Sequence, residues 1–394
     1  MVNLLFSLLF LTLPLLSIPS LAGGYELPKI IVFVTICDLS LIYFLFLLIK
    51  RKIVLAENPL IPFASIYLLI NFLASAFGIS WATSLYGSFF RKEGLITLTH
   101  YYFFFILLSQ AKNLRIKFGH LIQSLIIGGL LASLFALKQV GEGRIFGTFG
   151  EPNFLGGYLA LLFPFCFYLF KTSKNKLLRV LSLLTATVFA VTIYLTYSRT
   201  ALLSLGAVAA ILLVKQSKLR LKWFLFASII YLALLLVFRI SAVRGVSPNE
   251  NRLRIYTKAF EVFTKRPLLG YGKENFGLAF SNSLQDKDIG LKDLHIDRGH
   301  NQILDLLVEG GIIGLISYLL LVTKAFKILF MKLRKKEEPL LTATMLSLIA
   351  YLIIGQLNVF SLASNIIFWF LLGLIASRGS SEQRFSLNKR KIHK

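Results

Sequence analysis

Apolar runs of about 20 residues recur along the whole chain, and they constrain the fold more than any other feature. Hydrophobic residues make up 56% of the 394 residues, and the chain holds 36 phenylalanines. A helix of that length spans the hydrocarbon core of a bilayer and satisfies its own backbone hydrogen bonds there. The sequence therefore predicts an all-α, polytopic membrane protein.

We expect about twelve transmembrane helices, nine of them within residues 1–240 and three within residues 301–377. The expected spans are 3–22, 30–49, 60–78, 94–110, 119–138, 152–170, 177–196, 200–214, 223–240, 301–323, 339–357 and 364–377. Residues 241–300 form one large loop with amphipathic helices, and residues 378–394 form a basic tail. Since no basic segment precedes the first apolar run, we favour a transmembrane helix there over a cleaved signal peptide.

The net charge of +25 has a membrane explanation. In a soluble chain it would suggest a nucleic-acid partner, but here most Lys and Arg residues lie in short loops between apolar runs. The positive-inside rule then places both termini and these loops in the cytoplasm, and the 241–300 loop on the outer side. We therefore expect surrounding membrane lipids and no nucleic acid.

A single histidine, His300, lies where the longest polar segment runs back into an apolar helix. Histidine titrates near neutral pH, and neighbouring cations suit an anionic substrate such as a phosphate. Glu309 follows nine residues later, and a carboxylate at that depth needs a partner, such as an arginine or a neighbouring helix. The small residues Gly310, Gly311 and Gly314 predict the close approach of another helix.

Arg199 lies between two apolar runs, in the segment Tyr197-Ser198-Arg199-Thr200. A charge at this depth is costly unless it faces a cavity, a partner or the interface. Because Arg199 falls at the outer end of its helix, where orientation needs no positive charge, we favour a functional role over a snorkelling side chain.

Residues 251–263 carry apolar side chains at helical spacing and predict an amphipathic helix on the membrane surface. Arg252 and Tyr256 share one face of this helix. The alternative for Arg252 and Arg254 is a solvated basic face attracted to lipid headgroups. The segment Pro267–Gly272 predicts a tight turn that ends the helix.

The segment Gly147–Gly157 precedes the sixth expected span on the outer side. Asn153 has the side chain of a helix N-cap and follows Pro152. Glu151 and Asn153 are equally suited to binding sugar hydroxyls, so both interpretations stay open.

We expect no metal site. Asp286-Lys287-Asp288 matches the D-x-D pattern that binds a metal and a sugar nucleotide in many glycosyltransferases, but a solvated loop explains so short a pattern better. Cys37 and Cys166 lie far apart inside apolar runs, which favours structural thiols over a disulfide or a metal ligand.

Together these motifs resemble the O-antigen ligase family and its relatives, the O-antigen polymerases and the protein O-oligosaccharyltransferases. The ordered set is Gly-Glu-Pro-Asn153, Tyr-Ser-Arg199, Asn-Arg252 with an aromatic residue four positions on, Pro-Leu-Leu-Gly-Tyr-Gly272, Gly-His-Asn301 and Glu309-Gly-Gly. The resemblance covers residues 147–314, and the twelve-span layout extends it over the chain.

The resemblance implies an inner-membrane glycosyltransferase with its site on the periplasmic face. Such enzymes move a glycan from undecaprenyl diphosphate to an acceptor hydroxyl, here of lipid A–core, without a cofactor or metal. It assigns catalysis to His300, Arg199 and Arg252. The substrate-binding candidates beside them are Arg254, Tyr256, Glu151, Asn153, Asn301 and Glu309. Tyr256 departs from the family, which usually has Trp there, and Arg254 competes with Arg252 for the same role.

A metal-free mechanism follows for these groups. The arginines neutralise the charge that builds on the diphosphate, and His300 takes or orients the proton of the acceptor hydroxyl. Direct displacement inverts the anomeric carbon. The alternatives are an O-antigen polymerase, a protein-glycosylating relative, and a transporter or flippase for lipid-linked sugars, which would not need His300 to titrate.

Overall fold

The computed structural model of the 394-residue chain describes all residues except 22, 217–247, 289–290, 292–295 and 393–394. The described residues are helical and contain no strand, which confirms the expected all-α class. The expected span at 223–240 lies outside the described residues, as does part of the 241–300 loop.

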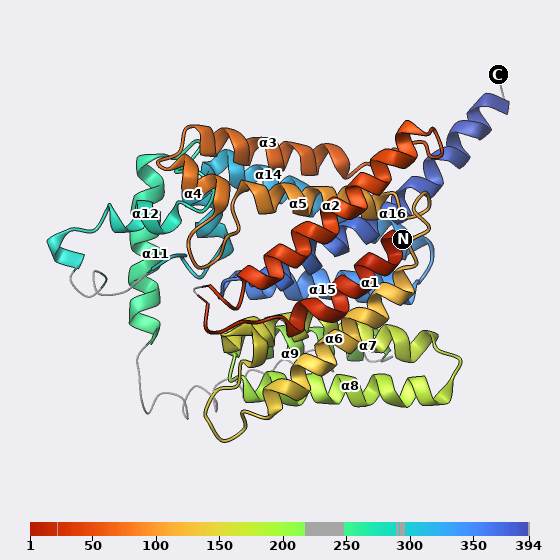
Figure 1. Ribbon diagram of the computed structural model, residues 1–394, viewed down its shortest axis with the longest axis horizontal. Helices are drawn as coiled ribbons and strands as arrows, with labels where there is room; N and C mark the ends of the chain where they lie inside the picture. Colours follow the sequence, from red (N-terminus) through yellow and green to blue (C-terminus); the bar gives the residue numbers. More distant parts are fainter. Residues whose placement is uncertain (22, 217–247, 289–290, 292–295, 393–394) are drawn as a thin grey trace.

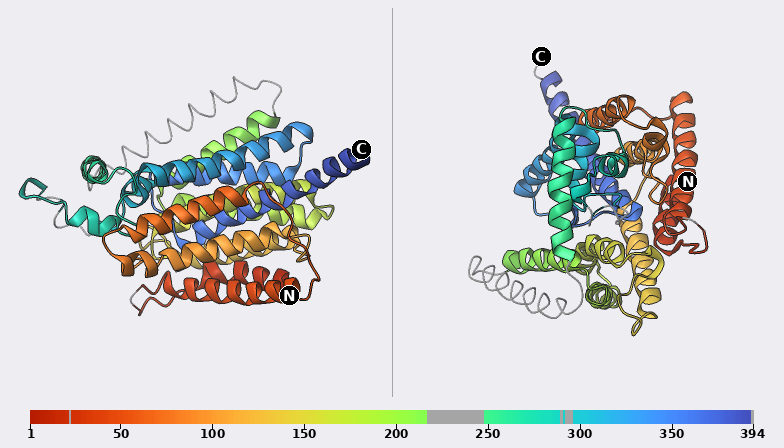
Figure 2. Two further views of the ribbon diagram at one scale, coloured as in Figure 1. Left: turned by 90° about the horizontal axis from the view of Figure 1, so that it is seen from above. Right: turned by 90° about the vertical axis from the view of Figure 1, so that its left-hand side faces the viewer.

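The chain forms a bundle of long helices with a cap of shorter ones. Its elements are α1 (Val2–Thr12), the 3-10 helix η1 (Leu13–Leu15), α2 (Leu27–Ile49), α3 (Ile61–Ala76), α4 (Trp81–Tyr86), α5 (Leu95–Ser109), α6 (Phe118–Leu137), η2 (Gly147–Phe149), α7 (Pro152–Thr172), α8 (Lys176–Leu195), α9 (Arg199–Gln216), α11 (Pro248–Lys265), α12 (Phe276–Ser281), η3 (Asp286–Asp288), α14 (Gln302–Lys335), α15 (Pro339–Gly355) and α16 (Leu362–Ile392). The amphipathic helix α11 lies across one end of the bundle, and both chain termini lie toward the opposite end (Figures 1 and 2).

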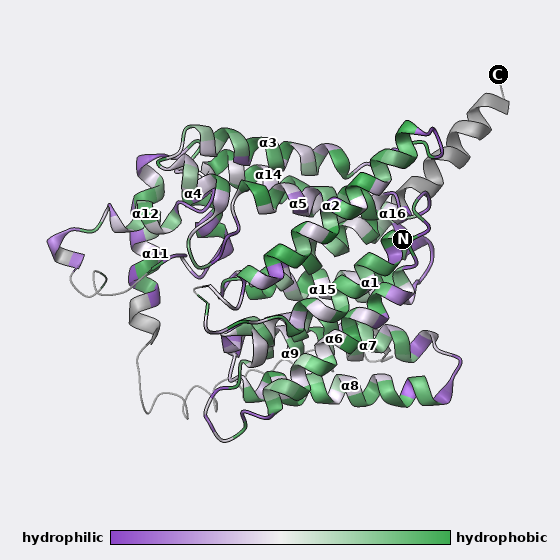
Figure 3. Cartoon of the chain, viewed as in Figure 1, coloured by the Kyte–Doolittle hydropathy of each residue, from purple (hydrophilic) through white to green (hydrophobic). Residues whose placement is uncertain are grey.

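Five described helices are long and apolar enough to cross a membrane, namely α2, α6, α7, α8 and α14. Six shorter apolar helices of 10–17 residues accompany them. Each of these helices begins within a few residues of the start of an expected span. Hydrophobic residues line most of the bundle, and hydrophilic residues gather toward its two ends (Figure 3). This is the distribution expected of a helical membrane protein.

Two expected helix ends were wrong. The first run, expected to continue to residue 22, leaves the α-helix at Thr12 because Pro14 cannot continue the backbone hydrogen bonds. Conversely, α14 continues past residue 323 to Lys335, since Lys and Arg are good helix formers and only the apolar run ends there.

Helix α16 forms the centre of the bundle. Every residue from Leu362 to Ser377 is buried except Asn365, which is half-buried. A helix that is apolar on all sides belongs in the interior. Its Trp369 stacks on Tyr101 of α5, with ring centroids 6.3 Å apart and planes 16° apart.

Helix α14 is broken at Gly311, whose φ of 63° and ψ of −167° are accessible to glycine alone. The loop Pro267–Gly272 lies in this break. Four backbone hydrogen bonds join loop and helix: Ile312 N to Pro267 O (2.8 Å), Ile313 N to Leu268 O (3.3 Å), Tyr271 N to Val308 O (2.9 Å) and Gly272 N to Glu309 O (2.8 Å). The glycine expected to admit a helix therefore admits the loop that follows α11.

We expect Gly311→Ala to destabilise the protein by at least about 3 kcal/mol. An added Cβ would meet the Leu268 carbonyl oxygen at 2.2 Å in a backbone conformation that alanine avoids. Thermal denaturation of the detergent-solubilised variants measures the loss in free energy of unfolding. Gly310→Ala is the matched control, because its Cβ would have no neighbour within 4 Å. Equal stability of the two variants would contradict this account of the break.

Candidate active site

His300 lies in the turn that leads into α14, with its backbone in the left-handed region (φ 51°). The Gly299 N–H donates to Asp305 Oδ1 (2.7 Å), and the Tyr256 hydroxyl donates to the His300 carbonyl (3.4 Å). A non-glycine residue in this conformation costs about 1–3 kcal/mol and persists where its surroundings hold it. The turn is therefore fixed from both α14 and α11.

Asn301 caps α14 directly after the histidine. Its Oδ1 accepts from the N–H groups of Ile303 (3.0 Å) and Leu304 (3.2 Å), and its Nδ2 donates to Gln356 O (3.0 Å). Both ends of this side chain are thus used within the protein. Its proposed contact with substrate stays a prediction.

The imidazole of His300 is half-buried and has one unpaired ring nitrogen. Nδ1 is buried without a hydrogen-bond partner in the described part of the chain. Burial lowers the pKa of His300, and the nearby charge of Arg252 lowers it further, whereas Asp297 acts in the opposite direction. The ring is therefore mainly neutral at pH 7, which is the form that can accept a proton.

Of the two rival arginines on α11, Arg252 is the one whose charge lowers the pKa of His300. Its Nη1 donates to the carbonyl of Leu357 (3.3 Å), in the segment between α15 and α16. Arg254 is exposed two residues later. Tyr256 stands one turn after Arg252, and its hydroxyl reaches the His300 carbonyl.

Arg144 connects the remaining motifs, and the sequence reasoning missed it. Its Nε donates to Thr196 O (2.9 Å), three residues before Arg199, and its Nη2 donates to Asn153 Oδ1 (3.2 Å). Partial burial lowers the pKa of Arg144; Glu151 opposes this, and the charges of Arg199 and Arg252 lower the pKa further. Three arginines from distant segments thus share one electrostatic environment.

The expected N-cap of α7 was wrong. Glu151 occupies that position and Pro152 is the first helical residue. Asn153 instead donates from Nδ2 to Glu151 Oε1 (2.6 Å) while its Oδ1 accepts from Arg144. Both residues therefore face the arginines, where their expected role in sugar binding stays a prediction.

A second residue that the sequence did not reveal is Arg91, from the loop before α5. Its Nε donates to Asp297 Oδ2 (2.6 Å), and its guanidinium lies 5.6 Å from the ring centroid of Phe154. Arg91 and Asp297 both act on the pKa of His300, in opposite directions. This ion pair joins the turn before His300 to the loop before α5.

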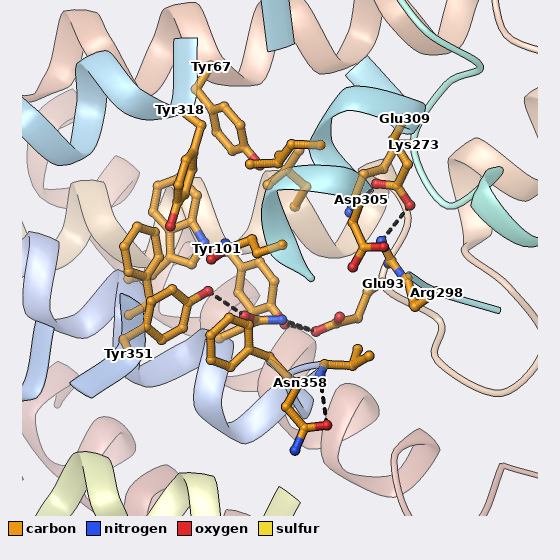
Figure 4. A pocket seen from close by; sticks show the side chains of 18 residues that line it. Tyr67, Glu93, Tyr101, Lys273, Arg298, Asp305, Glu309, Tyr318, Tyr351 and Asn358 are labelled. Atoms are coloured by element: carbon orange, nitrogen blue, oxygen red, sulfur yellow. Dashed lines mark hydrogen bonds and ion pairs between the residues drawn. The ribbon is translucent and has the colours of Figure 1, made fainter. Parts of the chain in front are cut away.

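A buried ion network supports the site (Figure 4). Arg298 binds the carboxylates of Glu309 (2.5 Å) and Glu274, and Lys273 Nζ binds the other oxygen of Glu309 (3.0 Å). Glu274 also accepts from the Ser88 N–H (3.0 Å). Glu309, a substrate-binding candidate, is thus buried and occupied by cations of the protein itself.

Two cavities flank these residues. One of about 90 Å³ lies beside the ion network, among Glu93, Asn358 and several tyrosines (Figure 4). The other, of about 560 Å³, lies between α12 and the segment 87–90. Asp297 forms part of its wall, with aromatic neighbours Phe89, Phe90 and Phe280. A cavity of this size can hold a small ligand.

Among the described residues, no group of three or more His, Cys, Asp or Glu side chains could hold a metal ion. Asp286 and Asp288 form η3. Asp288 pairs with Lys258 (3.0 Å) and accepts from the Gln285 N–H (2.9 Å), so this carboxylate serves the local turn. Cys37 and Cys166 are free and buried.

The fold and the site define a helical membrane protein in which arginines and a histidine meet at one end of the bundle. Residues 184–319 match the family model described as O-antigen ligase, so this part of the chain is similar to that family. The family covers glycosyltransferase-like ligases and polymerases. The matched range contains Arg199, Arg252 and His300. A comparison with curated proteins gave no match.

We expect Arg298→Met to destabilise the protein by about 3–5 kcal/mol, because it leaves buried carboxylates without their cation. Adding Glu274→Gln and Glu309→Gln should recover part of this loss, since neutral amides tolerate burial better. Denaturation of the detergent-solubilised variants gives their free energies of unfolding. Exposed Arg254→Met should change stability by no more than about 0.5 kcal/mol. A stable Arg298→Met single variant would show that the network does not hold the fold.

Proposed function

We propose that the protein is an inner-membrane glycosyltransferase that moves a glycan from undecaprenyl diphosphate to a hydroxyl of lipid A–core. The match of residues 184–319 to the O-antigen ligase family model supports the reaction class. The location of α11 and α12 at the end of the bundle away from the termini supports a periplasmic site with cytoplasmic termini (Figure 1).

The observation that carries the proposal is the unpaired Nδ1 of His300 beside Arg252, which has no carboxylate partner among the described residues. Nδ1 is buried and unpaired in the described chain, and Arg252 lies close enough to affect its pKa. A neutral imidazole next to a cation can accept a hydroxyl proton where negative charge develops nearby. A purely structural histidine would be expected to have its ring nitrogens satisfied.

The mechanism is a direct displacement. The acceptor oxygen attacks the anomeric carbon as the bond from that carbon to the diphosphate oxygen breaks. His300 receives the hydroxyl proton, and the leaving electron pair stays on the diphosphate, beside Arg199 and Arg252. Attack from the opposite face inverts the anomeric carbon. The residues provide charge and a proton acceptor for this step without a metal.

The central test uses purified protein, undecaprenyl-diphosphate glycan and lipid A–core, without added metal, and follows transfer on gels. His300→Ala should abolish transfer. Arg199→Ala and Arg252→Ala should each lower the rate by roughly a hundredfold, about 3 kcal/mol. Arg→Lys should recover activity only in part, because a point charge lacks the planar fork that fits phosphate. Arg254→Ala should lower the transfer rate less than Arg252→Ala does.

His120→Ala, an exposed histidine at the start of α6, is the matched control and should keep its activity. Retention of most activity by His300→Ala would refute the proton-transfer step. An inactive Arg254→Ala beside an active Arg252→Ala would move the role to Arg254. Elongation of a second lipid-linked glycan, with no transfer to lipid A–core, would identify a polymerase.

The pH profile tests the state of His300. Because the pKa of His300 in the free protein lies below the ordinary value of 6.5, kcat/KM for the donor should change little between pH 8 and 6.5 and fall only at lower pH. Asp297→Asn removes a charge that raises this pKa and frees Arg91, which lowers it. The acid limb of the profile should therefore shift to lower pH. A shift to higher pH, or no acid limb, would argue against His300 as the base.

A further inference from the structure

Among the described residues, no carboxylate forms an ion pair with Arg144, although Glu151 lies near enough to act on its charge. Its two partners, Thr196 O and Asn153 Oδ1, are neutral oxygens. Within the described residues it forms no ion pair, and neither do Arg199 and Arg252, whereas Arg91 and Arg298 both do. The Arg144 side chain is exposed overall, but its Nε is held against the Thr196 carbonyl, and the guanidinium lies within electrostatic reach of Arg199 and Arg252. Like charges gathered in this way repel one another, and an anion that joins them removes the repulsion.

The geometry of Arg144 leaves donors available. A guanidinium has five N–H groups in one plane, and the two known bonds occupy Nε and one donor of Nη2. The Nη1 donors and the second Nη2 donor remain for a ligand. These suit the paired oxygens of a phosphate, which guanidinium groups bind in a two-pronged fashion.

We propose that Arg144 is the third guanidinium of a diphosphate site and that it favours a diphosphate over a monophosphate leaving group. This inference rests on the proposed function. A lipid-linked sugar diphosphate has two negative charges, and breaking the bond to the sugar leaves a third charge on the terminal phosphate. Three arginines therefore match the charge of the departing product, whereas two match that of the bound donor.

Arg144 also braces the site, because it joins the segment before α7 to the turn before α9. A brace and a ligand-binding group predict different results. Loss of a brace alone would displace Arg199 and lower the turnover rate whichever anion is tested. Loss of a phosphate-binding group would weaken diphosphate binding more than monophosphate binding, even without turnover.

The experiment measures binding of inorganic pyrophosphate and of inorganic phosphate to the full-length protein in detergent, from their protection against thermal unfolding. The same anions are tested as inhibitors of transfer. The wild type should bind pyrophosphate at least tenfold more tightly than phosphate. Arg144→Gln should weaken pyrophosphate binding about tenfold or more, the effect of losing hydrogen bonds to a charged group, and reduce the preference. Arg144→Lys should bind pyrophosphate with an affinity between those of the wild type and Arg144→Gln.

Lys138→Gln is the matched control, since Lys138 is an exposed cation six residues away at the end of α6. It should bind pyrophosphate like the wild type. Unchanged pyrophosphate binding in Arg144→Gln, with slower transfer, would overturn the proposal and leave Arg144 as a brace. If the wild type binds no pyrophosphate while transfer proceeds, the diphosphate site itself is wrong. Selective pyrophosphate binding without transfer to any acceptor would instead contradict the proposed reaction.

Discussion

The position of His300 depends on one buried cation. Arg298 lies between Glu274, from the segment after the 267–272 loop, and Glu309 of α14. It therefore ties the turn before α14 to the loop that fills the break in that helix. The buried carboxylates of Glu274 and Glu309 are stable only while Arg298 remains between them. The strained backbone of His300 directly follows Gly299 and Arg298 of this network, and its carbonyl accepts from the Tyr256 hydroxyl.

The sequence predicted the helices well and their connections poorly. Apolar length alone located α2, α5, α6, α7, α8 and α15 to within a few residues, because a run that must satisfy its backbone inside lipid has few alternatives to a helix. It did not reveal that Gly311 breaks α14 for a loop. The same glycines are compatible with close helix packing, and the partner segment lies some forty residues away in the chain.

The motifs predicted the candidate site residues, and the structure places further charged residues beside them. Arg252 lies on the face of α11 that meets the segment after α15, where it donates to the Leu357 carbonyl, and Arg254 is exposed. Helical spacing alone does not show which face of α11 makes this contact. Arg144 and Arg91 carried no motif. One signal existed for Arg144: it is a cation in a short loop that we expect on the outer side, where the positive-inside rule does not call for positive charge. Their partners, Thr196 and Asp297, are far away in sequence, so only the fold brings them together.

In the proposed mechanism, the electrostatics of the candidate site link donor binding to activation of the acceptor. Before a donor binds, the charge of Arg252 helps to hold the pKa of His300 low. A diphosphate seated on the arginines would offset that charge and add negative charge of its own, and both changes favour protonated imidazole. His300 then becomes a stronger base in the complex than in the free protein. In the mechanism proposed here, the histidine therefore gains its ability to take the acceptor proton at the moment when the leaving group is in place.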